Sequence, residues 1–144
     1  MSVIKPWDPS PEVVFSYKKK SRKPKNLITV CVTNFNYASV IEECLDSIAD
    51  QTHADLEIVV VDDCSQRDDS VDVIAEWMEE NKQRFYSLQC LTNPRNQGPS
   101  FSRNMAFEYA QSEYVFIIDD DNTIYTPALE KIYTVRLKGI FPAV

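Results

Sequence analysis

The chain has 144 residues, 44% of them hydrophobic, and carries a formal net charge of −7. This length suits one domain with a buried core, and an acidic surface is unsuited to neutralising phosphates, so we expect no nucleic-acid partner. No apolar run approaches the roughly 18 residues of a membrane span, and the N-terminus has no apolar signal core, so we expect a cytoplasmic protein with a possible peripheral membrane contact.

Cysteine and glycine usage each exclude a class of site. The four cysteines form no CxxC pair, so we expect reduced thiols: Cys31, Cys44, Cys64 and Cys90. Gly98 and Gly139 are the only glycines, and two glycines cannot form the GxGxxG or Walker loops in which the backbone approaches phosphates. Any phosphate must therefore be held by other groups.

Residues 1–26 differ in composition from the rest of the chain. They contain four prolines, and six basic residues lie between Lys18 and Lys25. This composition predicts a solvated arm or linker. We therefore expect the folded domain to occupy residues 27–144.

From Leu27 onward, short apolar runs alternate with segments of helical periodicity. The runs predict four strands, at residues 27–33, 56–61, 85–91 and 114–118. Apolar stripes predict helices at 40–49, from Asp69 or Ser70 to Met78, from Phe101 to Tyr109, and after Pro127. This alternation is typical of an α/β fold with a mostly parallel sheet covered by helices.

Polar residues follow three of these strands. Residues 33–37 (TNFNY) follow the first, Asp62 and Asp63 the second, and residues 119–121 (DDD) the fourth. In a parallel sheet these groups converge on one rim, where such folds bind ligands. If the strand stays extended, Asp119 and Asp121 face the same way. Paired carboxylates suit a hard divalent ion such as Mg²⁺ or Mn²⁺, which completes its shell with phosphates and water.

Four segments together resemble the family 2 glycosyltransferases, which are inverting sugar transferases. They read ITVCVTNFNYASVIEECLDSI, LEIVVVDDCS, NPRNQGPSFSRN and YVFIIDDDNTIYTPALEKI. The resemblance implies the GT-A fold, a Rossmann-like three-layer sandwich. It also implies transfer of a sugar from a nucleotide-diphosphate sugar, with a UDP-sugar as the expected donor, to a hydroxyl of a saccharide, lipid or protein.

The resemblance also implies roles for individual residues. Asp121 would bind the metal, Mn²⁺ or Mg²⁺, and Asp119 would contact the ribose or assist the metal, with Asp120 as a spacer between them. Thr33 and Phe35 would line the base pocket, with Phe35 stacked on the base. Two further residues complete the expected donor site. Asp63 would accept the N3–H of uracil, a proton that thymine also offers, and Arg103 would contact the anionic part of the nucleotide.

Family 2 enzymes place the general base in a C-terminal acceptor-binding half, and here the chain ends at Val144, shortly after the expected metal ligand. We therefore expect the base beyond Val144 and a truncated domain that lacks the acceptor half. Two alternatives stay open. One is a nucleotide-sugar-binding or interaction module without transferase activity. The other is a haloacid dehalogenase-like phosphohydrolase, in which Asp119 of the DxDxT pattern would be the nucleophile.

Overall fold

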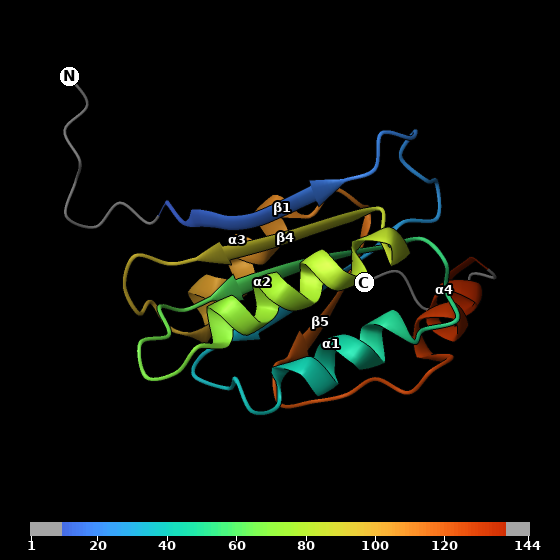
Figure 1. Ribbon diagram of the computed structural model, residues 1–144. Coiled ribbons are helices and arrows are strands. Elements are labelled where there is room, and N and C mark those ends of the chain that lie inside the picture. Colours follow the sequence, from blue (N-terminus) through green and yellow to red (C-terminus); the bar gives the residue numbers. More distant parts are fainter. Residues whose placement is uncertain (1–9, 138–144) are drawn as a thin grey trace, which may run out of the picture.

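The computed structural model describes residues 10–137, which form a five-stranded sheet in the order β1-β4-β3-β2-β5 (Figure 1). Strands β2 (Ile28–Asn34), β3 (Leu56–Asp62), β4 (Ser87–Thr92) and β5 (Tyr114–Asp119) are mutually parallel. They match the four strands that the sequence predicts. Buried strands of this kind read as continuous apolar runs because helices cover both of their faces.

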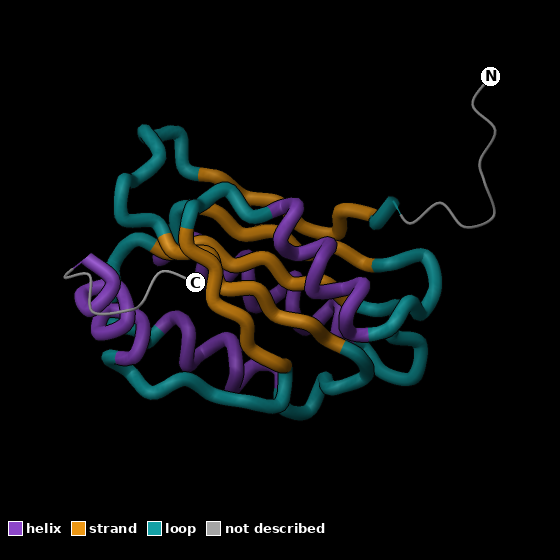
Figure 2. Tube along the Cα trace, turned by 180° about the vertical axis from the view of Figure 1, so that it is seen from behind, coloured by secondary structure: helices purple, strands orange, loops and turns teal. Residues whose placement is uncertain are grey.

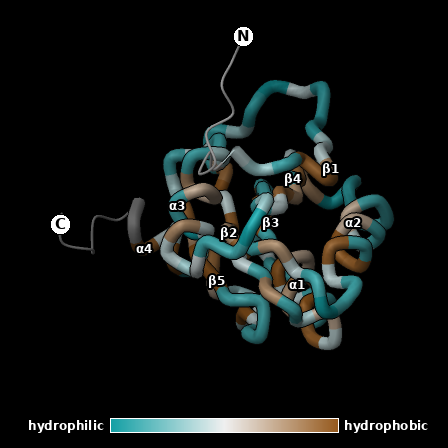
Figure 3. Tube along the Cα trace, turned by 90° about the vertical axis from the view of Figure 1, so that its left-hand side faces the viewer, coloured by the Kyte–Doolittle hydropathy of each residue, from teal (hydrophilic) through white to brown (hydrophobic). Residues whose placement is uncertain are grey.

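The helices divide between the two faces of the sheet, which gives three layers (Figures 2 and 3). Helices α1 (Ile41–Ala49) and α2 (Ser70–Asn81) contribute buried residues to the larger core cluster, as does Leu129 of α4 (Ala128–Leu137). Helix α3 (Pro99–Tyr109) packs on the opposite face, where Met105 and Ala106 contact Cys31, Val59 and Val61. A single-turn helix, η1 (Lys82–Arg84), follows α2. The expected three-layer α/β architecture is thus confirmed.

One strand was not predicted. Strand β1 (Glu12–Lys18) lies within the segment expected to be an arm, and it pairs antiparallel with β4 at the edge of the sheet. Phe15 and Tyr17 alternate along it and pack, partly buried, against the larger core cluster. The other residues of the strand are exposed. Prolines and lysines dominate the composition of the surrounding segment and conceal the alternation of Phe15 and Tyr17.

The basic segment between β1 and β2 lies away from the predicted site. Lys18 pairs with Ser87, the first residue of β4, so residues 18–25 lie at the end of the sheet where the parallel strands begin. The acidic strand ends lie at the other end. The fold therefore separates the two strongest charge clusters of the sequence by the length of the strands.

The four cysteines are free, as predicted, and only Cys64 is partly exposed. Burial is the main reason that the pKa values of Cys31, Cys44 and Cys90 are each raised to about 12. Because the thiolate is the reactive form, these three thiols should not react in the native protein at pH 8. We expect Ellman's reagent to titrate one thiol rapidly in the native protein and four in denaturant.

Replacement of Cys64 by serine is the control for this prediction, because it should remove the rapid phase and leave three thiols in denaturant. A rapid phase that survives in Cys64→Ser would show that one of the three core cysteines is accessible, and would contradict the packing described above.

Candidate functional site

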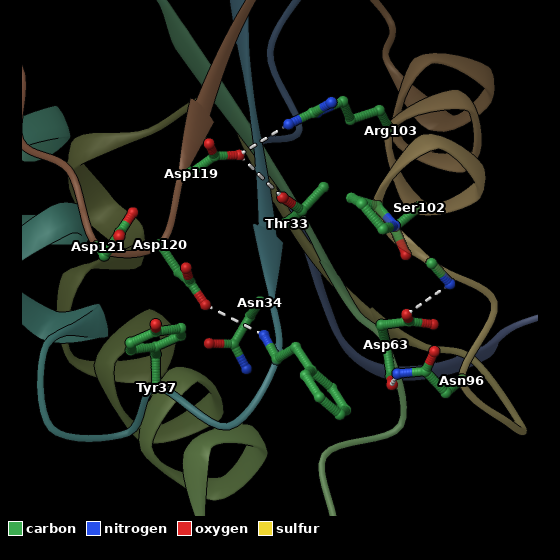
Figure 4. Close-up of a pocket in the computed structure, with 13 residues that line it drawn as sticks. Thr33, Asn34, Tyr37, Asp63, Asn96, Ser102, Arg103, Asp119, Asp120 and Asp121 are labelled. Carbon is green, nitrogen blue, oxygen red and sulfur yellow. Dashed lines mark hydrogen bonds and ion pairs between the residues drawn. The ribbon is translucent and has the colours of Figure 1, made fainter.

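The carboxyl ends of β2, β3 and β5 meet the start of α3 around a cleft of about 410 Å³ (Figure 4). The register of the sheet brings its residues together, because Asn34 pairs with Asp62 and Thr33 pairs with Asp119. All six residues that the sequence assigns to donor or metal binding line this cleft: Thr33, Phe35, Asp63, Arg103, Asp119 and Asp121. The chain thus assembles the predicted residues in one place.

The three consecutive aspartates do not alternate as strand residues would. Strand β5 ends at Asp119, and the chain then turns, with the Asn122 N–H donating to the Asp119 carbonyl at 3.1 Å. Asp120 is buried and accepts a hydrogen bond from the Phe35 N–H at 3.0 Å, whereas Asp121 is exposed. The expectation that Asp119 and Asp121 share one face of an extended strand is therefore wrong, because the extension stops too early. Asp120 is also more than a spacer, since it fixes the loop that carries Phe35.

These carboxylates create a negative field around themselves. The pKa of Asp120 is raised to about 6, chiefly by burial, with smaller contributions from Asp121 and Asp119 that the Phe35 hydrogen bond opposes. Burial and the same three aspartates also raise the pKa of the Cys44 thiol, whose sulfur lies 3.7 Å from the Asp119 carbonyl oxygen. A positive group near the turn would offset this repulsion.

Arg103 supplies one such group from α3. Its Nη2 lies 3.2 Å from Asp119 Oδ1, and the Thr33 hydroxyl donates to the same oxygen at 3.4 Å. Figure 4 shows the arginine reaching from its helix toward the end of β5. Arg103 Nε is buried and has no hydrogen-bond partner in the part of the chain that is described. The arginine thus lines the cleft with its guanidinium at Asp119, while its side chain stays partly exposed.

Asp63 has a role that the sequence did not reveal. Its carboxylate accepts hydrogen bonds from Asn93 Nδ2 at 2.9 Å, the Gln97 N–H at 2.7 Å and the Gly98 N–H at 2.8 Å. Gly98 has a φ of +91°, a conformation that favours glycine, and it caps α3 with Pro99 as the first helical residue. A carboxylate has about four acceptor positions, so Asp63 holds this loop and still has one for a ligand.

Asp62 is fully buried and organises the two neighbouring loops. It accepts hydrogen bonds from Asn34 Nδ2 at 2.7 Å, the Ser65 N–H at 2.9 Å and the Thr92 hydroxyl at 3.1 Å. The Ser65 hydroxyl also donates to it. Two residues beside this network have positive φ angles, Asn36 at 55° and Cys64 at 62°. The rim of the cleft is therefore built by buried hydrogen bonds rather than by glycine-rich turns.

Several lining residues were not assigned from the sequence, among them Asn34, Tyr37, Asn96 and Ser102. Asparagine, serine and tyrosine in loops are common in any sequence, so their types carried no signal. Asn34 and Tyr37 belong to the 33–37 segment that the sequence placed on this rim, whereas the places of Asn96 and Ser102 are revealed only by the three-dimensional arrangement.

The carboxylates suit one class of metal better than another. Within residues 10–137, no group of three or more histidine, cysteine or acidic side chains is arranged as a metal site. Structural zinc usually has four nitrogen or sulfur ligands. Asp119 and Asp121 alone fit Mg²⁺ or Mn²⁺ better, because such ions take one or two protein carboxylates and complete their shell with substrate phosphates and water.

The described residues contain no helix long and apolar enough to cross a membrane.

Comparisons with known proteins point to one family. The family model described as "Glycosyl transferase family 2" matches residues 29–136. The putative teichuronic acid biosynthesis glycosyltransferase TuaG of Bacillus subtilis is 33% identical over 107 residues, which cover 74% of this chain and 40% of that protein. The poly(ribitol-phosphate) beta-glucosyltransferase of Bacillus spizizenii is 33% identical over 109 residues, 74% of this chain and 16% of the relative.

Solved structures give the same result. The S. aureus TarS 1–349 structure in complex with UDP-GlcNAc superposes with a TM-score of 0.68 at 29% identity, over 77% of this chain and 31% of that one. The mannosyltransferase PcManGT from Pyrobaculum calidifontis, in complex with GDP-Man and Mn²⁺, has a TM-score of 0.69 at 29% identity, over 98% of this chain and 37% of that one. The matched part of the chain covers 40% or less of each of these four proteins. With a family model matched over most of its residues and relatives above 30% identity, the chain belongs to glycosyl transferase family 2.

Proposed function

We propose that this chain forms the donor site of an inverting glycosyltransferase, which binds a UDP-sugar with Mn²⁺ or Mg²⁺ for transfer of the sugar to an acceptor hydroxyl. One observation carries the proposal: a single cleft contains an exposed aromatic ring, a buried carboxylate, an arginine and a pair of aspartates, all from the strand ends and α3. These are groups that can bind a base, a ribose and a diphosphate.

Each group has a place in this proposal. The Phe35 side chain is 45% exposed and is free to stack on the base, and Asp63 offers its remaining acceptor position to the uracil N3–H. Thr33 and Asp119, which contact each other, lie beside the ribose. Asp121 and Asp119 hold the metal, and Arg103 meets the diphosphate, where a planar guanidinium can pair with two oxygens.

The chain's own residues position the donor and hold its charge. Asp120 fixes the Phe35 backbone, and Asp63 fixes the loop that begins α3, so the groups that face the base and the diphosphate are preorganised. The metal, when bound, neutralises the charge that develops on the departing diphosphate. We assign none of these carboxylates as the general base, because each is committed to the donor site or to backbone N–H groups.

Support for a nucleotide-sugar donor comes from the two solved neighbours, one with UDP-GlcNAc and the other with GDP-Man and Mn²⁺. They differ in base, so calorimetry should compare UDP with GDP, each with Mn²⁺ and with EDTA. We expect UDP to bind with Mn²⁺ and to bind about 100-fold more weakly in EDTA, a difference of about 2.7 kcal/mol. Absence of UDP binding under both conditions would contradict the proposal, and tighter binding of GDP would correct the base.

The second candidate, a donor-binding module without transferase activity, is favoured by the hydrogen bonds and the ion pair that already engage Asp63, Asp119 and Asp120. Incubation of the 144-residue chain with Mn²⁺ and UDP-sugars distinguishes this candidate from an active transferase. Release of UDP would show that this chain cleaves the donor bond and would contradict the binding-only candidate. Binding without release would support it for this chain.

A further inference from the structure

Arg103 and Asp119 form a contact that stands between two cavities. Both residues line the 410 Å³ cleft, and both also line a second cavity of about 470 Å³ that runs along β5. Nη2 of Arg103 lies 3.2 Å from Asp119 Oδ1, and the two side chains are 39% and 46% exposed. The arginine therefore covers one oxygen of a carboxylate that the proposed function assigns to the metal and the ribose.

The contact is incomplete on the arginine side. An arginine fork pairs best with two oxygens at once, but Arg103 makes one contact with Asp119, and its buried Nε has no partner among the described residues. Once the guanidinium turns away from Asp119, a diphosphate in the cleft can satisfy Nε and Nη2 together. The arginine thus has a better partner in the nucleotide than in Asp119.

The charges around this contact also favour movement of Arg103 from Asp119 to the nucleotide. Three consecutive carboxylates line the cleft, those of Asp119, Asp120 and Asp121. In the part of the chain that is described, Arg103 with Asp119 is the ion pair that involves them, and the other ion pair, Lys82 with Glu79, joins η1 to α2. A divalent ion that approaches Asp119 without a nucleotide is repelled by the positive charge of Arg103, which contacts the same carboxylate. A divalent ion that arrives with a diphosphate meets a guanidinium that can move to the phosphates.

We propose that Arg103 is a positioning residue that occupies Asp119 until a diphosphate arrives, so that the cation and the nucleotide bind as mutually dependent ligands. The inference rests on the proposed function, since it assumes that Asp119 and Asp121 bind the metal. It adds that Arg103 opposes binding of the free cation and favours binding of the cation with the nucleotide. By linkage, the nucleotide then raises metal affinity by the same factor as the metal raises nucleotide affinity.

The test measures three affinities in the wild type and in Arg103→Gln: Mn²⁺ alone by electron paramagnetic resonance, UDP in EDTA, and UDP with saturating Mn²⁺. We expect Arg103→Gln to bind free Mn²⁺ at least about fivefold more tightly than the wild type, and the dependence of UDP affinity on Mn²⁺ to shrink by at least a similar factor. Arg103→Lys keeps the charge and should leave the affinity for free Mn²⁺ near that of the wild type.

Arg95→Gln is the matched control. Arg95 is exposed on the neighbouring loop, has no ion pair among the described residues, and lines a separate cavity with Phe35 and Asn96. Its replacement removes the same charge from the same rim, so an equal gain in Mn²⁺ affinity would show a general charge effect and overturn the proposal. Circular dichroism and thermal unfolding verify that each variant is folded.

The outcomes separate the two levels of inference. If the wild type binds no UDP in the presence of Mn²⁺, the proposed function fails. If the wild type binds UDP with Mn²⁺ but Arg103→Gln binds free Mn²⁺ no more tightly than the wild type, the proposed function stands and the role of Arg103 is wrong.

Discussion

Replacement of Asp121 by asparagine is expected to weaken the binding of UDP in the presence of Mn²⁺ by about 100-fold, or about 2.7 kcal/mol. Asp121 is exposed in the turn after β5 and accepts no hydrogen bond from the described residues that would hold it for a structural purpose. Asparagine keeps its shape and removes the charge that a hard cation requires. UDP affinity should then be nearly the same with Mn²⁺ and with EDTA, which calorimetry measures directly.

The control for this prediction is Glu113→Gln. Glu113 is exposed and precedes β5, at the opposite end of the strand from Asp121, so the variant makes the same charge change far from the cleft. It should bind UDP with Mn²⁺ as the wild type does. Both variants should unfold within about 2 °C of the wild type, since surface substitutions rarely change stability by more than about 0.5 kcal/mol. Asp121→Asn with unchanged Mn²⁺ dependence would remove Asp121 from the metal site.

Periodicity was sufficient to predict the parallel part of the sheet. Runs such as residues 58–61 are buried on both faces and therefore apolar throughout, and the stripes of α1 and α2 are covered by the larger core cluster. Strand β1 was missed because most of its residues are exposed and because the prolines and lysines around it dominate the composition of the segment. Edge strands of this kind carry the weakest pattern, since half of their contacts are with water.

The site was predictable as a location but only partly as a mechanism. Strand order brought Thr33, Asp63 and Asp119 to one rim, as expected for parallel strands. The end of β5 at Asp119 was not predictable, because three identical residues give no signal for where extension becomes a turn. The roles of Asp120 and Asp63 in fixing loops were not predictable either, because the sequence does not tell a buried aspartate from an exposed one.

Strand order also decides against the phosphohydrolase alternative. That alternative requires the DxDxT pattern to follow the first strand of its sheet, whereas Asp119 ends β5, the last strand of the described residues. The family comparison agrees with the strand order. Local sequence alone did not separate the two readings, because IIDDDNT satisfies both patterns.

The second large effect concerns stability. Replacement of Asp62 by alanine is expected to lower the free energy of unfolding by about 3 to 5 kcal/mol, because hydrogen bonds to charged groups contribute about 1.5 to 3 kcal/mol each and an unsatisfied buried donor costs about 1 to 3. The fully buried carboxylate accepts from Asn34, Ser65 and Thr92, which belong to three different segments. Its loss leaves the Ser65 N–H and the Thr92 hydroxyl without this acceptor in a space that water enters poorly, whereas the Asn34 amide keeps its bond to the Ser70 hydroxyl.

Urea denaturation with linear extrapolation measures this loss. Asp62→Asn should cost less than Asp62→Ala, since one amide oxygen still accepts, and Glu76→Ala on the exposed face of α2 should stay within about 0.5 kcal/mol of the wild type. A loss below about 1 kcal/mol for Asp62→Ala would mean that the loops are held by other contacts. If the loss is as large as expected, weakened UDP binding in this variant follows from a disordered rim, because Asp62 positions Asn34 and Ser65 without lining the cleft itself.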